Sequence, residues 1–267
     1  MIELFKSDLR DDGRRSSKGN QLKWETEDIW YKADYLGYEG LSEFVVSALL
    51  KDSSLESPEY VEYFPEQIKY GSQVFCGCRS MDFAGGWQTI TLERLFMMLY
   101  GTSLNKSIYS IRDHEERLRF LVDQTERATG IDGFGIYISK LFTLDALFLN
   151  EDRHTHNISV LMDGKGNYRV CPIYDNGAAL LSDTSLDYPL GKDIYELIAA
   201  VKPKTICDSF DEQLEIAEKL YGRNISFSFD HNTVSSILAA ADIYTPETRD
   251  RVYNILLEQR RKYIYLF

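Results

Sequence analysis

The sequence predicts an α+β fold with two lobes, a β-rich lobe over residues 1–82 and a larger helical lobe over residues 83–267. Two changes in hydrophobic period support this prediction. Residues 28–35 alternate aromatic and polar side chains, as a half-buried strand does, and residues 37–51 place their apolar side chains on one helical face. The Asp-Phe-Ala-Gly-Gly cluster at residues 82–86 then interrupts regular structure, so we place the boundary between the lobes there.

The other elements follow from the same periodicities. We expect further strands of the first lobe at residues 60–64 and 72–79. In the second lobe we expect a hairpin of strands 159–162 and 168–173, and helices over residues 89–100, 113–128, 134–149, 208–220, 232–241 and 246–263. The helix at 134–149 is apolar on nearly every side, which is typical of a helix buried within a domain. Thr245 is expected to cap the last helix, with Pro246 in its first turn.

Composition and charge argue against several classes of function. The chain has 267 residues, 44% of them apolar and 27% charged, values near the norm for globular proteins. Its apolar runs are far too short to span a bilayer. The formal net charge of −12 disfavours phosphate backbones and anionic lipids, so we expect no direct nucleic-acid partner and no membrane partner. The 4 cysteines lack a regular framework, which indicates a reducing compartment, so we expect a cytoplasmic protein.

The strongest chemical signal is a set of three polar residues in the second lobe. Asp152 is followed five residues later by Asn157, and Asp175 stands directly before an Asn-Gly pair. In kinases an Asp orients the attacking hydroxyl, and an Asn and a second Asp hold Mg²⁺ through oxygen atoms. Either piece alone is more often an ordinary polar loop or turn. Their order and spacing, with a buried helix before them and a hairpin between them, favour a bilobal kinase.

Two upstream residues are expected to complete a nucleotide site. Lys32, in the strand at residues 28–35, is the expected ligand of the α and β phosphates, and Glu43 on the following helix can pair with it. Residues 15–23 form a short basic loop with a glycine, whose backbone N–H groups can approach phosphate oxygens closely. A lysine in a strand usually faces solvent. Lys32 and the basic loop therefore indicate a nucleotide site only in combination with the downstream kinase motif.

Two other motifs allow different readings. His154 and His156 form a His-x-His pair, which could supply metal ligands to a metal-dependent hydrolase. Such sites usually recruit further histidines, and the remaining two, His114 and His231, have no recognisable ligand context in the sequence. The Cys-x-Cys pair at residues 76–78 places both side chains on one face of a strand, where packing is the commoner role.

Together these segments resemble the HipA-type serine/threonine kinases, the toxin halves of bacterial persistence toxin–antitoxin pairs. Residues 16–23 are similar to that family's S-x-x-G-x-Q-x-K nucleotide loop, and residues 43–46 resemble its Glu-bearing helix. Residues 152–157 and 174–175 resemble its catalytic and metal loops, in the same order. The resemblance covers residues 14–180.

The resemblance implies a protein-kinase-like fold and phosphorylation of serine or threonine with ATP and Mg²⁺. Asp152, Lys32 and Glu43 would be catalytic, and Asn157 and Asp175 would bind the metal. The implied nucleotide-binding residues are Gly19, Gln21, Lys23, Lys32, Cys76, Cys78 and His154. The backbone of residues 76–80 would hold the adenine, and autophosphorylation of Ser16 would disable the nucleotide loop. Studied members modify aminoacyl-tRNA synthetases and are restrained by a small DNA-binding antitoxin, so a protein substrate and such a partner are implied here.

Some features depart from the family pattern. About fifteen residues precede the nucleotide loop, which predicts a short form without the N-terminal subdomain of longer members. His156 stands where the family often has Lys. The Asp-Asn-Gly and Asp-Arg-His motifs also occur among lipid kinases and atypical kinases. A kinase of a lipid head group or small molecule therefore stays open, as does a nucleotide-binding interaction module without turnover.

Overall fold

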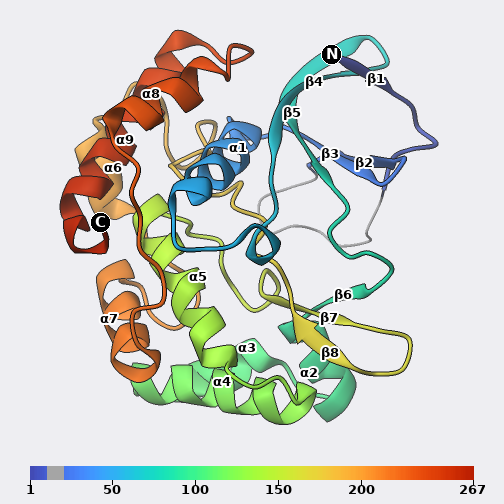
Figure 1. Cartoon of the computed structure of the whole chain (residues 1–267), viewed down its shortest axis with the longest axis vertical. Coiled ribbons are helices and arrows are strands. Elements are labelled where there is room, and N and C mark those ends of the chain that lie inside the picture. The colour runs from blue at the N-terminus through green and yellow to red at the C-terminus, as the bar shows by residue number, and fades with distance from the viewer. Residues whose placement is uncertain (11–20) are drawn as a thin grey trace. The chain divides into compact units, whose positions relative to one another are not determined.

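The computed structural model describes residues 1–10 and 21–267 (Figure 1). The chain divides into two compact units. Unit 1 comprises Met1–Phe83, Tyr174–Ala200 and Ser226–Phe267, and unit 2 comprises Ala84–Ile173 and Val201–Ile225. The first break, after Phe83, lies one residue from the predicted lobe boundary. After Ile173 the chain returns to unit 1, passes again to unit 2 and ends in unit 1. A division of the chain at a single boundary does not anticipate this alternation. These units are defined by packing, so the two lobes at residues 1–82 and 83–267 stay a prediction.

Within the described part of unit 1, five strands form one sheet in the order β1-β4-β5-β3-β2. They are β1 (Ile2–Leu4), β2 (Lys23–Thr26), β3 (Ile29–Ala33), β4 (Phe64–Tyr70) and β5 (Gln73–Met81). β1 runs parallel to β4, and the other pairs are antiparallel. An apolar cluster covers part of the sheet, because alternate side chains of a strand point to one face. Its buried members are Leu4, Trp24, Tyr31, Ala33 and Ile68.

The described part of unit 1 also contains helices, one packed against the sheet and others near the end of the chain. They are α1 (Glu39–Leu49), α6 (Ile194–Ala200), α8 (His231–Ala239) and α9 (Pro246–Lys262). α1 packs against β3, β4 and β5, and α8 packs against both α1 and α9. The buried guanidinium of Arg251 on α9 donates to Tyr38 Oη (3.1 Å), just before α1, and to the carbonyl of Tyr188 (2.9 Å). This arginine ties the last helix to the start of α1.

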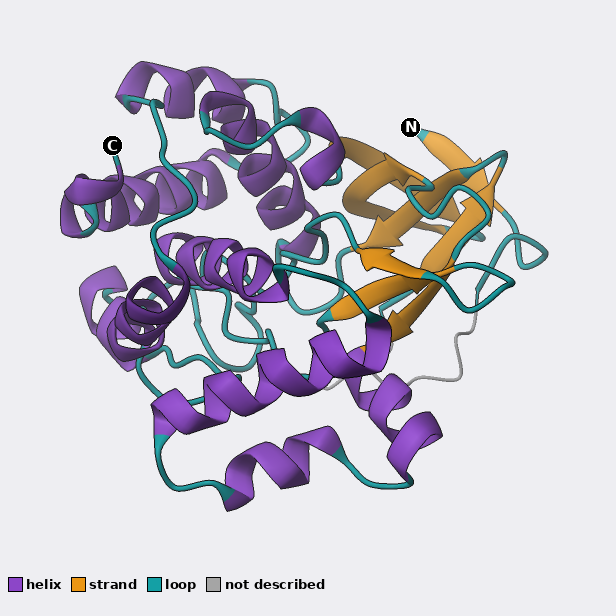
Figure 2. Ribbon diagram, turned by 60° about the horizontal axis from the view of Figure 1, so that its bottom comes forward, coloured by secondary structure: helices purple, strands orange, loops and turns teal. Residues whose placement is uncertain are grey.

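Unit 2 combines a small sheet with long helices (Figure 2). The sheet has the order β6-β7-β8, with β6 (Gln88–Thr91), β7 (Ser159–Met162) and β8 (Tyr168–Val170). The helices are α2 (Leu92–Tyr100), α3 (Leu104–Ser110), α4 (His114–Thr129), α5 (Phe134–Phe148) and α7 (Phe210–Tyr221). α5 is buried over nearly its whole length and packs against α7, as its apolar composition predicts.

Two predicted elements differ from the structure for identifiable reasons. Residues 60–63 form no strand, and β4 begins only at Phe64. The side chains of Tyr60, Val61 and Tyr63 are buried instead, and the Tyr63 N–H donates to Ser47 Oγ of α1 at 3.0 Å. The helix expected from residue 89 begins at Leu92, because Thr91 ends β6 and caps the helix by accepting from the Arg94 N–H (3.2 Å). Among the described residues, no helix combines the length and the apolar composition needed to cross a membrane.

A close backbone approach between α1 and the sheet, at Gly40 and Gly77, predicts an unusual effect of an alanine substitution. A Cβ added to Gly40 of α1 would lie 2.5 Å from the Gly77 carbonyl carbon of β5. Alanine for glycine inside a helix normally stabilises by about 0.5–1 kcal/mol. We expect Gly40→Ala to lower the free energy of unfolding by about 1–3 kcal/mol, because backbone cannot yield as a side chain does. Urea denaturation measures this, with Gly191→Ala as the control, since a Cβ there meets nothing within 4 Å. An unchanged or raised stability of Gly40→Ala would contradict the packing.

Candidate functional site

A buried cluster of charges joins three segments of unit 1. Lys32 lies on β3, Glu43 on α1, and Asp175 in the chain that follows β8. The Lys32 ammonium is 2.6 Å from Glu43 Oε1 and 2.9 Å from Asp175 Oδ1. The second carboxylate oxygen of Glu43 accepts from the Asn176 N–H at 2.8 Å. Glu43 therefore positions both the lysine and the backbone next to Asp175.

Burial and the neighbouring charges act in opposite directions on the pKa values of this cluster. Lys32 is 9% exposed and Glu43 is 1% exposed. Burial alone would lower the pKa of Lys32, but the carboxylates of Asp175 and Glu43 hold that pKa well above its usual value. Burial raises the pKa of Glu43, and the neighbouring Lys32 opposes that shift. The lysine therefore stays charged, as a ligand of phosphate must.

The backbone at Asp175 adopts a conformation that few side chains tolerate. Its φ is 61°, in the left-handed region where aspartate and asparagine are found more often than most residues. The preceding Tyr174 packs its ring against Phe83, with 5.0 Å between the ring centroids. Backbone of this kind persists where neighbours hold it in place, and such positions concentrate at functional sites.

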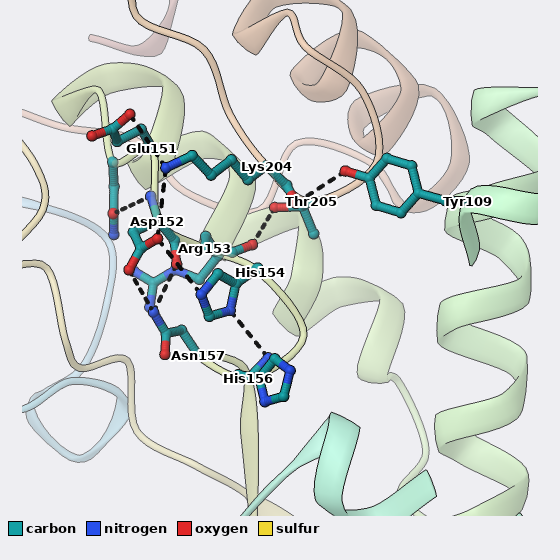
Figure 3. A network of polar contacts seen from close by, with 10 residues as sticks. Tyr109, Glu151, Asp152, Arg153, His154, His156, Asn157, Lys204 and Thr205 are labelled. Carbon is teal, nitrogen blue, oxygen red and sulfur yellow. Dashed lines mark hydrogen bonds and ion pairs between the residues drawn. The ribbon is translucent and has the colours of Figure 1, made fainter. Parts of the chain in front are cut away.

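In unit 2 the loop of residues 150–157 leaves the end of α5 and is anchored to that helix. The Arg153 Nε donates to both carboxylate oxygens of Asp145, at 3.1 and 3.3 Å, and both side chains are buried. Burial raises the pKa of Asp145 to about 6, and Arg153 acts against the shift. The carbonyl of Arg153 accepts a hydrogen bond from Thr205 Oγ1 (Figure 3). The buried ion pair of Arg153 and Asp145 thus anchors the loop to α5.

Asp152 and Asn157 are hydrogen-bonded to each other within this loop. The Asn157 amide nitrogen donates to the Asp152 carbonyl (2.8 Å) and to Asp152 Oδ2 (3.1 Å), so its amide oxygen faces away from Asp152 (Figure 3). His154 Nε2 lies 3.6 Å from Asp152 Oδ1. Burial lowers the pKa of His154, although Asp152 acts to raise it. The five-residue spacing therefore places one carboxylate and one amide oxygen on a single rigid turn.

A second anchor of this loop could not be recognised from the local sequence motif. Glu93 on α2 accepts from Thr155 Oγ1 and from the Asn105 N–H, each at 2.9 Å, and its own N–H donates to the Thr155 carbonyl (3.1 Å). Burial would raise the pKa of Glu93, but hydrogen bonds from Ser103, Asn105 and Thr155 lower it. An acidic residue among the buried positions of an amphipathic helix is the signal that could have revealed it.

Comparisons with known proteins give one informative result. No family model and no curated protein sequence matches the chain. Among solved structures, the chain is similar to the crystal structure of the Helicobacter pylori proinflammatory kinase CtkA. The TM-score is 0.65 with 17% sequence identity, and the match covers 98% of this chain and 95% of that chain. The fold is kinase-like. This confirms the predicted fold class.

Among the described residues, the His-x-His pair is not part of a cluster of three possible metal ligands. The Nδ1 of His154 accepts from the His156 N–H at 3.2 Å. In the described part of the chain, the side chains that gather as three possible metal ligands are His114, Cys207 and Glu212. His114, which has no recognisable ligand context in the sequence, has its Nδ1 2.6 Å from Glu212 Oε1, and burial raises the pKa of the Cys207 thiol to about 11. This cluster is hydrogen-bonded and links α4 to α7.

The remaining predicted nucleotide ligands lie in or near β2. Lys23 is paired directly with Lys32 across β2 and β3, so the two side chains share one face of the sheet. Gln21 lies two residues before β2, where the neighbouring Leu22 carbonyl accepts from the Ala33 N–H at 3.0 Å. Ser16 and Gly19 fall outside the described residues. The nucleotide loop and its autophosphorylation stay predictions.

Cys76 and Cys78 lie inside β5, between β3 and β4. Cys78 is paired with Lys32 on one side and with Pro65 on the other, and its side chain is fully buried. The Cys76 carbonyl accepts from the Asp34 N–H at 2.8 Å. Because these peptide groups already take part in the sheet, the structure lends no support to an adenine contact here, which stays a prediction.

The buried pair predicts a large loss of stability when one partner is removed. Glu43→Ala leaves the Lys32 charge in a dry site with only Asp175 beside it, and an uncompensated buried charge costs roughly 3–5 kcal/mol. We expect a fall of that order in the free energy of unfolding, measured by chemical denaturation. Glu62→Ala is the control, because its 2.8 Å pair with Lys51 is between side chains that are 35% and 53% exposed and should contribute about 0–1 kcal/mol. Equal effects of the two variants would show that the Glu43 pair is not buried as described.

Proposed function

We propose that this protein is an ATP- and Mg²⁺-dependent serine/threonine protein kinase of the HipA-like type. The observation that carries the proposal is the 2.6 Å contact between the Lys32 ammonium on β3 and the Glu43 carboxylate on α1. Kinases require a strand lysine that pairs the α and β phosphates and is held by a helix glutamate. The kinase-like fold supports this assignment.

The other residues take the roles that phosphoryl transfer requires. Asp152 would orient the hydroxyl of the substrate and accept its proton. The Asn157 amide oxygen and the Asp175 carboxylate are oxygen donors, the ligand type that Mg²⁺ prefers, so each side chain fits the role of a ligand to this ion. When bound, Mg²⁺ supplies charge neutralisation at the phosphates. Asp175 would then contact both the Mg²⁺ ion and the Lys32 ammonium, with which it is already paired at 2.9 Å.

The substrate class rests on the sequence resemblance. The segment similar to the Gly-x-Gln-x-Lys nucleotide loop favours the protein-kinase branch over lipid or metabolite kinases. We therefore propose a protein substrate in the cytoplasm, such as a translation component, and a small DNA-binding antitoxin as a partner. The 4 cysteines, all described, are free thiols, which supports a reducing compartment.

Phosphate mapping tests the proposal. The protein is incubated with labelled ATP and Mg²⁺, alone and with a cell extract, and phosphorylated residues are identified by mass spectrometry. We expect phosphate on serine or threonine, including residues of the N-terminal loop. Asp152→Asn should reduce the rate by at least about 10²-fold, because it removes the group that accepts the proton. Asp123→Asn, on the exposed face of α4, is the control and should retain full activity.

The outcomes separate the proposed function from its alternatives. Label that appears only on a lipid or metabolite would indicate a small-molecule kinase. Binding of ATP without transfer to any acceptor would indicate an interaction module. Transfer that survives in Asp152→Asn, with thermal stability equal to wild type, would show that the assigned residue is wrong.

A further inference from the structure

A lysine from a distant segment lies beside the two acidic residues of the candidate catalytic loop. Lys204 belongs to the connection between α6 and α7, and its ammonium is 3.8 Å from Asp152 Oδ1 and 3.6 Å from Glu151 Oε2 (Figure 3). Its side chain is 46% exposed, whereas those of Asp152 and Glu151 are 12% and 7% exposed. A ligand that reaches Asp152 from solvent would therefore meet the Lys204 ammonium as well.

The backbone around Lys204 is fixed although its side chain is exposed. Tyr109 Oη donates to the Lys204 carbonyl at 3.1 Å, and Thr205 Oγ1 donates to the Arg153 carbonyl of the catalytic loop. The Arg117 guanidinium donates to the Ile206 carbonyl at 2.7 Å. Hydrogen bonds from α3 and α4, and one to the loop itself, thus hold this segment against residues 150–157. An ordinary surface lysine has no such support.

The distances indicate that neither acid engages the ammonium fully. Both exceed the usual limit of about 3.2 Å for a hydrogen bond, so the N–H groups of Lys204 remain able to donate elsewhere. An ion pair with a partly exposed lysine contributes only about 0–1 kcal/mol to stability, so a contribution to folding does not explain why the Lys204 ammonium lies beside Asp152. The transferring phosphoryl group, in contrast, carries charge on its equatorial oxygens and is stabilised by a fixed cation.

We propose that Lys204 is a catalytic residue that binds an oxygen of the transferring γ-phosphoryl group beside Asp152. The inference rests on the proposed function. In the reaction, the substrate hydroxyl oxygen forms a bond to the γ-phosphorus and loses its proton to Asp152. The bond from that phosphorus to the β–γ bridging oxygen breaks, and ADP leaves with the electron pair. Lys204 donates hydrogen bonds to the γ-phosphoryl oxygens throughout and exchanges no proton.

Three variants and two nucleotides test the inference. Lys204→Ala removes the cation, Lys204→Arg retains it, and Lys202→Ala is the matched control, since Lys202 lies in the same segment and pairs with Asp208 at 2.8 Å. For each protein, kcat and the KM for ATP are measured by phosphate transfer. Dissociation constants for ADP and for the imido analogue of ATP, which cannot transfer its γ-phosphate, are measured by calorimetry with Mg²⁺.

We expect Lys204→Ala to lower kcat by about 10²–10³-fold, the usual effect of removing one fixed donor to a developing charge. It should weaken the imido analogue several-fold and leave ADP binding unchanged, because only the analogue has a γ-phosphate. Lys204→Arg should recover part of the rate, and Lys202→Ala should stay within about twofold of wild type.

Several results would overturn the inference. An unchanged kcat in Lys204→Ala would do so, as would a raised kcat, which would mean that the lysine blocks Asp152. If Lys204→Ala weakened the binding of the imido analogue and of ADP equally, the lysine would have a structural role instead. Failure of the proposed function can be told apart from failure of this inference, because the wild-type protein would then transfer no phosphate. In that case the comparison of binding of the two nucleotides would still test Lys204. Wild type that binds neither nucleotide would overturn both.

Discussion

The buried ion pair between Lys32 and Glu43 is the constraint on which the candidate site depends. Removing two charges from water is expensive, and apolar residues of similar volume often give equal or better stability. This chain nevertheless keeps the pair in the interior, beside the Tyr63 ring, with 5.2 Å between the ammonium and the ring centroid. The pair fixes positions: the lysine meets Asp175, and the second oxygen of Glu43 holds the Asn176 N–H. A site for phosphate needs such a fixed cation, and a hydrophobic replacement would not supply it.

Unit 2 contains a second buried ion pair, which positions its own candidate residues. Arg153 and Asp145 form a buried pair that anchors the loop of Asp152 and Asn157 to α5, and Glu93 holds the loop from α2. Each unit therefore positions one proposed metal ligand next to a buried ion pair, Asp175 in unit 1 and Asn157 in unit 2. Preorganised charges of this kind need little rearrangement during phosphoryl transfer, where positioning and electrostatic stabilisation supply most of the catalysis.

Local sequence patterns predict much of the fold and one contact of the candidate site. The period changes identify α1 and α5 within two residues, and Thr245 caps α9 as expected. The kinase motifs predict that Glu43 pairs with Lys32, and the structure confirms this contact. Patterns fail where tertiary packing decides: residues 60–63 pack beside α1, and the segments after residue 173 alternate between units. Lys204 has no local signal, because only the folding of unit 2 brings it to Asp152.

The central claim is that Glu43 acts on a bound nucleotide through Lys32, with which it is paired at 2.6 Å. A double-mutant cycle tests it directly, using Lys32→Ala, Glu43→Gln and the double variant. Calorimetry gives the free energy with which each protein binds the imido analogue of ATP in the presence of Mg²⁺. If Glu43 acts through Lys32, its substitution should have little further effect once the lysine is absent, so we predict an interaction energy of about 1 kcal/mol or more. Effects that add to within about 0.3–0.5 kcal/mol would show that the two residues are independent and would contradict the claim.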